Sequence, residues 1–323
     1  MAWVSFDYAM RAQRTQSWVN QHDWFWTMLE KIAKRLGRIS WILVGVRVRL
    51  IALLVGSEKT IASRDFESDL HGLRFCGNLS SYIDWRIYFL GTYDAITLRL
   101  MALYLEHVEE PVALDVGANV GNHALFLSKH CKVIHAFEPY PPVLAQLKRN
   151  ISINHLSNII VHEVGIGTVR KRMPYFENDT NNLGAGSFEV THEGTNERAA
   201  MSLDLVNGDE YLFEQQVVKV DLVKMDVEGF EVDALTGLQE TMREYRPAVV
   251  FEIGPTTRRK VQTLERLHAL FPDDYRFFTI KRAGVFCPEE PGIEALQFDR
   301  NGNAFAVPAE KAFAVESRIA RTS

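Results

Sequence analysis

The sequence contains few cysteines, no long apolar run and no excess of positive charge. Its three cysteines, Cys76, Cys131 and Cys287, lie far apart without metal-ligand spacing, which is typical of free thiols in a reducing compartment. The most apolar stretch, residues 39–57, contains two arginines, whereas a bilayer span needs about 20 predominantly apolar residues. A net charge of −5 argues against binding to nucleic acid. No secretory signal is visible either, so we expect a cytoplasmic protein.

The first 60 residues differ from the rest. They carry a net charge of +5 and hold five of the six tryptophans. Apolar residues recur there every three or four positions, which predicts one amphipathic helix over residues 24–55; they are Met28, Ile32, Leu36, Ile39, Leu43, Val46 and Leu50. Two interpretations stay open. The helix contacts an anionic membrane peripherally, or it packs against its own domain or a dimer partner.

From Val112 onward, short apolar runs alternate with helical patterns, as in a parallel α/β sheet. The predicted strands are Val112–Val116, Val133–Phe137, Ile159–Val164, Val218–Met225, Ala248–Ile253, Tyr275–Ile280 and Ala304–Val307. The predicted helices are Asp94–His107, Asn119–Lys129, Pro142–Ile153, Phe230–Arg243 and Thr256–Phe271. The polar residues 168–202 interrupt this alternation, and we predict a hairpin or lid over the site there.

A glycine turn follows the strand Val112–Val116. Asp115 lies at the end of the strand, and Gly117 and Gly121 follow with the spacing GxxxG. In an open α/β sheet, a nucleotide binds at the carboxyl end of this strand. Gly117 lets the backbone approach the ligand, and Gly121 lets the following helix pack closely on the strand. The turn is therefore a candidate cofactor site.

Charge at this turn distinguishes two classes of cofactor. A carboxylate at Asp115 repels the pyrophosphate of a dinucleotide but attracts an ammonium and a sulfonium, as in S-adenosylmethionine. Glu138 ends the second strand, where a carboxylate accepts hydrogen bonds from the ribose hydroxyls of either class. A nicotinamide-dependent oxidoreductase remains the alternative, although GxGxxG is missing. We predict that S-adenosylmethionine is bound by Asp115, Gly117, Asn119, Gly121, Asn122 and Glu138.

Three segments in order resemble the FkbM family of S-adenosylmethionine-dependent methyltransferases: Leu114–Gly121, Phe137–Pro139 and Val223–Glu231, which contains Asp-Val-Glu-Gly. Ile87–Tyr93 is similar to a segment that precedes the core of that family, and the resemblance covers about Leu73 to Val307. It implies a class I methyltransferase, an α/β fold with a Rossmann-like core. The sheet would have seven mostly parallel strands, the last one antiparallel, and helices on both faces. It also implies O-methylation, commonly of a sugar or polyketide hydroxyl.

The resemblance suggests a division of the chain into three parts. Residues 1–70 form an N-terminal helical extension, residues 71–310 an FkbM-type methyltransferase domain, and residues 311–323 a C-terminal tail. The cofactor core of the domain spans about residues 111–253. The extension lies outside the resemblance, so its role rests on its composition alone.

Three carboxylates are predicted beside the cofactor. Asp226 and Glu228 alternate at the end of the fourth strand, and Glu252 lies at the end of the fifth. Carboxyl ends of neighbouring parallel strands meet at one edge, so these acids converge there. We predict that at least one is catalytic, and Asp226 is the preferred general base. A weaker possibility is that the three hold a divalent metal such as Mg²⁺.

We therefore predict a methyltransferase that acts on a hydroxyl of a small molecule or glycan. Besides the oxidoreductase, the alternative is a non-catalytic scaffold with a methyltransferase-like fold. No nucleic acid partner is expected. The sequence does not set the acceptor or the oligomeric state.

Overall fold

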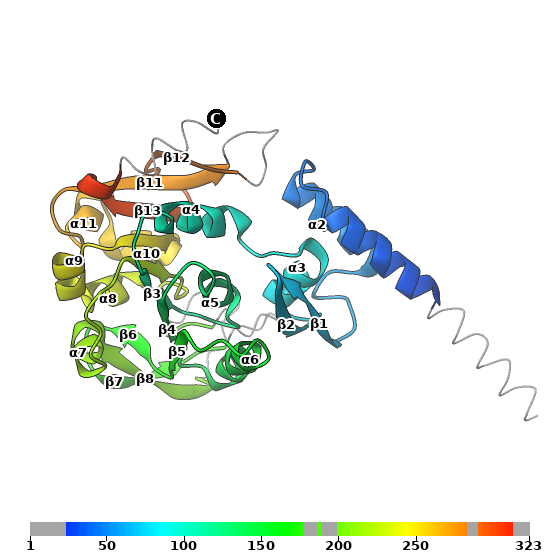
Figure 1. The fold of residues 1–323 in the computed structure, drawn as a ribbon, viewed down its shortest axis with the longest axis horizontal. Helices are drawn as coiled ribbons and strands as arrows, with labels where there is room; N and C mark the ends of the chain where they lie inside the picture. Colours follow the sequence, from blue (N-terminus) through cyan, green and yellow to red (C-terminus); the bar gives the residue numbers. More distant parts are fainter. Residues whose placement is uncertain (1–23, 178–185, 189–198, 283–289, 313–323) are drawn as a thin grey trace, which may run out of the picture.

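The computed structural model describes residues 24–177, 186–188, 199–282 and 290–312. Its main sheet has the strand order β12-β11-β13-β10-β9-β3-β4-β5 (Figure 1). The strands are β3 (Val112–Val116), β4 (Val133–Phe137), β5 (Ile159–His162), β9 (Leu222–Met225), β10 (Ala248–Ile253), β11 (Tyr275–Arg282), β12 (Pro291–Ala295) and β13 (Gly302–Pro308). The five from β5 to β10 are parallel, whereas β13 is antiparallel to both neighbours.

The sheet differs from the prediction in one respect. The seven predicted strands are present and the last one is antiparallel, as expected. The described sheet has eight strands instead of seven, because β12 pairs antiparallel with β11 at the edge. The sequence around β12 is too polar and too rich in proline and glycine to predict a strand by itself.

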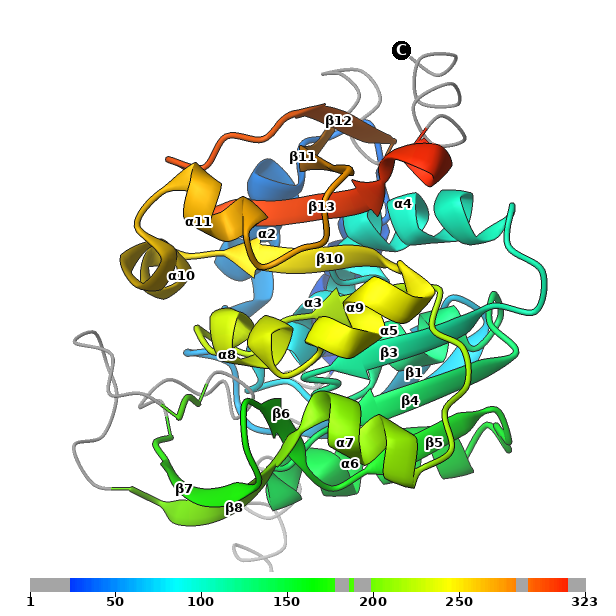
Figure 2. The same ribbon diagram turned by 90° about the vertical axis from the view of Figure 1, so that its left-hand side faces the viewer.

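Helices cover both faces of the sheet (Figure 2). One layer contains α4 (Ala95–Leu105), α5 (Asn122–Leu127) and α6 (Pro141–Ser152). The other contains α7 (Gly208–Glu214), α8 (Glu231–Thr236), α9 (Gln239–Tyr245), α10 (Pro255–Val261) and α11 (Leu264–His268). Successive strand residues alternate between the layers: Ala113 packs in the first core and Leu114 in the second.

Two predicted helices are each broken in two. Phe230–Arg243 becomes α8 and α9, because the backbone of Gly237 packs closely against β6: a Cβ at Gly237 would lie 1.9 Å from the carbonyl oxygen of Gly167. Thr256–Phe271 becomes α10 and α11. Gln262 has a φ of 65°, and the hydroxyl of Thr263 caps the second helix by accepting from the N–H of Arg266.

A second sheet, of three strands, follows β3, β4 and β5 in the chain. It consists of β6 (Gly165–Gly167), β7 (Lys171–Tyr175) and β8 (Met201–Asn207) in the order β6-β8-β7. β7 and β8 pair antiparallel, so they form the two arms of the predicted hairpin. Most residues of the predicted lid, 178–185 and 189–198, lie outside the described part of the chain.

The N-terminal part contains two helices, so the prediction of one helix over residues 24–55 is wrong. Residues 24–37 are helical, residues 38–43 are not, and α2 (Val44–Val55) follows. Because of this break, several residues of the predicted apolar face are exposed. Ile32, Leu43, Val46 and Leu50 are 41–44% exposed. Other apolar side chains, Ala33, Ile51 and Val55 among them, face the domain instead.

These two helices pack against α3 (Tyr82–Leu90), beside the hairpin of β1 (Asp65–Leu70) and β2 (Leu73–Asn78) (Figure 1). The backbone of Gly37 approaches Phe89, where a Cβ would lie 2.0 Å from the carbonyl oxygen. The inner face of the N-terminal helices therefore packs against their own domain. The predicted domain boundary at residue 70 falls inside the β1–β2 hairpin. No helix among the described residues is long and apolar enough to cross a bilayer.

Candidate active site

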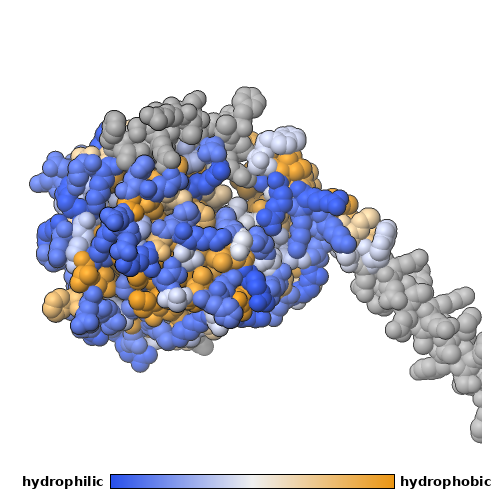
Figure 3. Space-filling view, viewed as in Figure 1, coloured by the Kyte–Doolittle hydropathy of each residue, from blue (hydrophilic) through white to orange (hydrophobic). Residues whose placement is uncertain are grey.

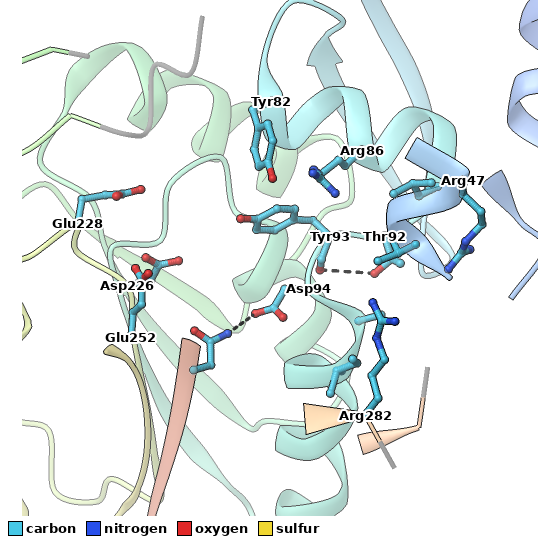
Figure 4. Close-up of a pocket in the computed structure, with 15 residues that line it drawn as sticks. Arg47, Tyr82, Arg86, Thr92, Tyr93, Asp94, Asp226, Glu228, Glu252 and Arg282 are labelled. Atoms are coloured by element: carbon cyan, nitrogen blue, oxygen red, sulfur yellow. Dashed lines mark hydrogen bonds between the residues drawn. The ribbon is translucent and has the colours of Figure 1, made fainter. Parts of the chain in front are cut away.

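Two cavities lie at the carboxyl ends of the parallel strands, and Asp226 and Glu228 line both. The larger has a volume of about 460 Å³ and lies between the strand ends, α3, the start of α4 and α2 (Figure 4). The smaller is a crevice of about 50 Å³ beside the turn after β3. The larger cavity is the candidate acceptor site, and the crevice is the candidate cofactor site.

The glycine turn holds the strand ends together. Gly117 has a φ of 75°, and a Cβ there would lie 2.0 Å from the carbonyl oxygen of Asp226. Gly121 has a φ of 91°, and its Cβ would lie 2.7 Å from the Cδ1 atom of Leu147 in α6. The first glycine therefore lets the turn after β3 touch the turn after β9. The second lets α5 and α6 pack closely.

Glu138 is a buried carboxylate on the wall of the crevice. It accepts hydrogen bonds from the N–H groups of Asn119 and Tyr140, each at 2.9 Å. Burial raises its pKa to about 7. Gly117 and Asn119 line the same crevice, opposite apolar side chains that include Phe188. The lining thus combines a carboxylate acceptor with apolar side chains, which is the chemistry that recognises ribose hydroxyls and a base.

Asp115 and Lys224 form a buried ion pair behind this wall. Asp115 is fully buried, with an oxygen 3.3 Å from the Nζ atom of Lys224, and Lys224 also donates to the carbonyl oxygen of Gly117 at 3.1 Å. Burial lowers the pKa of Lys224, but the negative charges of Asp115 and Asp226 outweigh it, so the net shift is upward. The pair thus braces the glycine turn from behind.

Three of the predicted cofactor residues are not among the residues that line either cavity: Asp115, Gly121 and Asn122. Asn122 is buried, and its amide nitrogen lies 3.0 Å from the Nδ1 atom of His123. Direct contact of these three residues with a cofactor stays a prediction. The structure gives Asp115 and Gly121 the contacts that shape the turn.

The predicted catalytic acids line the larger cavity together. Asp226 follows β9 directly, and its N–H donates to the carbonyl oxygen of Val116 at 3.0 Å. Glu228 is two residues further in a tight turn, with a φ of 50°, and Glu252 lies near the end of β10. Figure 4 shows the three carboxylates on one side of the cavity. The predicted convergence of the strand ends is therefore present.

Glu231 holds the turn that carries two of these acids. Its side chain is buried, with one oxygen accepting from the N–H groups of Val227 and Gly229, each at 3.2 Å. The other oxygen accepts from the hydroxyl of Thr257 at 2.9 Å. This role was not predicted, because Glu231 in the first turn of a helix was interpreted as a solvated or paired charge.

The electrostatics of the cavity favour protonated glutamates. Burial raises the pKa of Glu252 to about 7, and Asp226 adds to the effect. The side chain of Glu228 is exposed to the cavity, yet the surrounding walls and Asp226 raise its pKa to about 8. Among the described residues, no group of three or more His, Cys, Asp or Glu side chains is arranged to hold a metal ion. The weaker prediction of a metal at these acids is therefore not supported.

Several cavity residues were missed from the sequence. Asp94 lies at the start of α4 with a φ of 55° and accepts hydrogen bonds from Thr97 at 2.8 Å and Asn303 at 3.1 Å. An aspartate before a helix is usually a cap, so its place in the cavity was not evident. The other missed residues are Arg47, Tyr82, Arg86, Tyr93 and Arg282.

The fold and this arrangement of strand ends are those of a methyltransferase-like α/β protein. The family model of the Methyltransferase FkbM domain matches residues 115–278, just over half of the chain. The matched segment begins at Asp115 and contains the glycine turn, Glu138 and all three catalytic candidates. The chain therefore belongs to the FkbM methyltransferase domain family.

Two curated methyltransferases are similar to part of this chain. Hexuronic acid methyltransferase AglP of Haloferax volcanii is 31% identical over 168 residues, which are 51% of this chain and 64% of that protein. Methyltransferase 1 of Beauveria bassiana is 28% identical over 169 residues, 45% of this chain and 65% of that protein. The matches thus span less than two thirds of either relative.

A solved structure of methyltransferase FkbM from Methylobacillus flagellatus is also similar. It is 16% identical, with 70% of this chain and 53% of that chain covered at a TM-score of 0.42. At this score the likeness carries no argument about the site.

Proposed function

We propose that this protein is an S-adenosylmethionine-dependent O-methyltransferase whose acceptor is a hydroxyl of a small molecule or glycan. The observation that carries the proposal is that Asp226 and Glu228 line both the cofactor crevice and the acceptor cavity. When bound, S-adenosylmethionine supplies a methyl group on a sulfonium, which an oxygen nucleophile can take in an in-line displacement. The chain has to hold the acceptor in line and receive its proton.

The crevice residues would hold the adenosyl group. Glu138 accepts hydrogen bonds from the ribose hydroxyls, and Asn119 and Gly117 form the floor of the crevice. The crevice is small, so the methionyl part would extend past Asp226 towards the larger cavity. The carboxylate of Asp226 there favours a ligand with an ammonium and a sulfonium.

Asp226 is the best candidate for the general base. It directly follows β9, at the junction of the two cavities. An acceptor hydroxyl in the larger cavity would pass its proton to the carboxylate of Asp226, an effect typically worth ~100- to 10,000-fold. With raised pKa values, Glu228 and Glu252 hold protons near neutral pH and can donate hydrogen bonds to the acceptor. Holding the acceptor in line contributes up to ~7–11 kcal/mol in favourable cases.

A carbohydrate acceptor has support from one relative. The Haloferax volcanii protein is named a hexuronic acid methyltransferase. Tyr82 and Tyr93 line the larger cavity, with ring centroids 6.1 Å apart at an angle of 80°. These rings give the cavity an apolar wall beside its charged ends, which suits an acceptor with both polar and apolar faces.

The proposal is tested by methyl transfer from CD₃-labelled S-adenosylmethionine into a cell extract, followed by mass spectrometry. Asp226→Asn keeps the shape of the side chain and removes its basicity. We expect turnover to fall at least ~100-fold with little change in cofactor affinity. Asp204→Asn, at an exposed position of β8, is the control and should behave as wild type. Failure of the wild type to bind S-adenosylmethionine would favour the scaffold alternative. Full turnover of Asp226→Asn would remove Asp226 as base.

A further inference from the structure

The acceptor cavity has opposite charges at its two ends (Figure 4). Asp226, Glu228 and Glu252 lie at the end next to the cofactor crevice. At the other end lie three arginines from separate elements: Arg47 of α2, Arg86 of α3 and Arg282 at the end of β11. Methyl transfer to a hydroxyl does not by itself require this second, basic end.

Arg86 and Arg282 are suited to bind an anion. Neither forms an ion pair with a carboxylate in the part of the chain that the structure describes. The guanidinium of Arg86 lies over the ring of Tyr82, with its carbon 4.3 Å from the centroid, which fixes its place on the wall. Arg47 is buried and donates to the carbonyl oxygen of Gly37 at 2.7 Å, so it adds positive charge from behind. A guanidinium binds a carboxylate or phosphate through two parallel hydrogen bonds.

We propose that the acceptor is an anion whose carboxylate or phosphate binds Arg86 and Arg282 while its hydroxyl meets Asp226. This rests on the proposed function. The carboxylate of Asp226 at the cofactor end repels an anionic group, and the arginines attract it, so the acceptor enters in one orientation. The hydroxyl is therefore the atom presented for methylation, and its proton passes to Asp226. The product is a methyl ether that keeps its anionic group, rather than a methyl ester.

The experiment separates a cell extract on an anion-exchange resin into a retained and a flow-through fraction. Each fraction is incubated with the protein and CD₃-labelled S-adenosylmethionine. We expect the label to enter compounds of the retained fraction and to resist mild alkali, as an ether does. Phosphatase treatment then distinguishes a phosphate from a carboxylate in the labelled product. Label only in neutral compounds, or in an alkali-labile ester, would overturn the inference but leave the proposed methyltransferase intact.

Variants connect this preference to the arginines. Arg86→Gln and Arg282→Gln should each raise KM for the retained fraction ~10- to 100-fold, the range of a charged hydrogen bond, with a smaller change in kcat. Arg→Lys at the same positions should restore part of the loss. Arg172→Gln, on the exposed side of β7, is the matched control. Binding of S-adenosylhomocysteine, measured by calorimetry, should be unchanged in all of them. Unchanged KM values in both Gln variants would contradict the assignment of the anion site.

A different observation concerns the outer face of α2. Val46, Leu50 and Leu53 are spaced by four and three residues, so they share one side of the helix. All three are exposed, Leu53 at 84%, and Trp41 in the preceding segment is 73% exposed. Figure 3 shows hydrophobic residues reaching the surface at the N-terminal helices. This face is opposite to the one that packs on α3.

The exposed charges of the N-terminal helices have one sign. Within residues 24–60, every exposed charged side chain is basic: Lys31, Arg35, Arg38, Arg49 and Lys59. The two acids of this segment, Glu30 and Glu58, are partly buried, and Glu30 pairs with Arg64 at 2.8 Å. An apolar helical face in a basic segment complements a membrane surface with anionic headgroups.

From this face we infer that α2 lies on an anionic membrane surface, with Val46, Leu50 and Leu53 at the headgroup boundary. Co-sedimentation of the full chain is measured with vesicles of phosphatidylcholine alone and with added phosphatidylglycerol. We expect binding only with the anionic lipid, and weaker binding as salt rises. Leu53→Ser should reduce it several-fold. The control Phe213→Ser removes an equally exposed side chain, 84%, from α7 and should have no effect.

Two outcomes would overturn the membrane inference. One is equal, negligible sedimentation with both kinds of vesicle. The other is a dimer in analytical ultracentrifugation that Leu53→Ser dissociates, because a second copy of the chain would then cover this face.

Discussion

At the scale of single residues, the site depends on a backbone contact that leaves no room for a side chain. Gly117 touches the carbonyl of Asp226, so the cofactor turn and the turn with the candidate base are fixed relative to each other. The buried pair of Asp115 and Lys224 supports the same turn, because Lys224 donates to the carbonyl of Gly117. The candidate base is therefore positioned by contact with the same turn that lines the candidate cofactor crevice.

Gly117→Ala tests this contact. Its Cβ would lie 2.0 Å from the carbonyl oxygen of Asp226, at a φ of 75° that alanine rarely adopts. We expect the free energy of unfolding to fall by about 2 kcal/mol or more and cofactor affinity to fall with it. Gly45→Ala is the matched control, because nothing lies within 4 Å of its Cβ. A thermal melt in which both variants equal wild type would refute the close approach of the two turns.

Glu252 gives a pH-dependent prediction. Its folded pKa of about 7 is above the ordinary value of 4.5. A raised folded pKa adds stability that is complete below 4.5 and is lost as pH rises through about 7. Glu252→Gln avoids this loss, so at pH ~8.5 it should be more stable than wild type by about 1–3 kcal/mol. At pH ~4.5 the gain should disappear. The melting temperatures of wild type and Glu252→Gln at both pH values test this. The same difference between the two proteins at both pH values would disprove the charge argument.

The positions of single site residues were predictable only where a motif joined them to a strand end. Glu138, Asp226 and Glu228 follow predicted strands, Glu252 lies at the end of one, and each lines a cavity. Arg86, Asp94 and Arg282 were not predictable, because helix and loop residues from distant segments meet there only through the tertiary fold. The acidic end of the cavity was thus evident in the sequence, but its basic end was not.

At the scale of elements, the turn between β9 and α8 carries the candidate catalytic residues Asp226 and Glu228. Glu228 and Gly229 have successive positive φ values, 50° and 96°, and such conformations persist only when their surroundings hold them. Glu231 does so by accepting two N–H groups of the turn. This explains physically why two glutamates occur three residues apart in the segment Val223–Glu231. The first lines the cavity and the second fixes the turn.

Glu231→Ala should loosen this turn. It leaves two N–H groups and the hydroxyl of Thr257 without their acceptor, at a cost of about 1–3 kcal/mol for a buried donor. We expect kcat to fall more than the affinity for S-adenosylhomocysteine, because the candidate base moves while Glu138 does not. Glu240→Ala, at an exposed site of α9, is the control. If kcat of Glu231→Ala stays at the wild-type level, the hydrogen bonds of Glu231 are not needed to position the turn.

The strands were predictable where each is a short continuous apolar run between polar segments. β3, β4 and β10 match the predicted bounds, because buried parallel strands are short continuous apolar runs. The helix breaks at Gly237 and Gln262 were missed, since helical periodicity continues across them and only contacts with other elements show the interruption. The apolar periodicity of residues 24–55 predicted one helix for the same reason. It continues across residues 38–43, whereas the chain leaves the helix there, next to the contact of Gly37 with Phe89 of α3.

At the scale of the whole molecule, the N-terminal helices complete the site that the family domain begins. The family match starts at Asp115, yet the acceptor cavity is closed by Arg47 of α2 and by Tyr82 and Arg86 of α3. The inner face of the N-terminal helices packs on α3, and their outer face stays apolar. Residues before the family match, such as Arg47 and Arg86, and residues after it, such as Arg282, therefore line the cavity together with residues of the matched domain.

The proposed function depends on binding of S-adenosylmethionine in the crevice at Glu138, which calorimetry with S-adenosylhomocysteine measures. We predict that the wild type binds this product and that Glu138→Ala weakens binding ~10- to 100-fold, the loss of a charged hydrogen bond of about 1.5–3 kcal/mol. Glu163→Ala, an exposed neighbour that pairs with Lys148, should bind as wild type does. A dissociation constant unchanged in Glu138→Ala, or no binding by the wild type, would contradict the account.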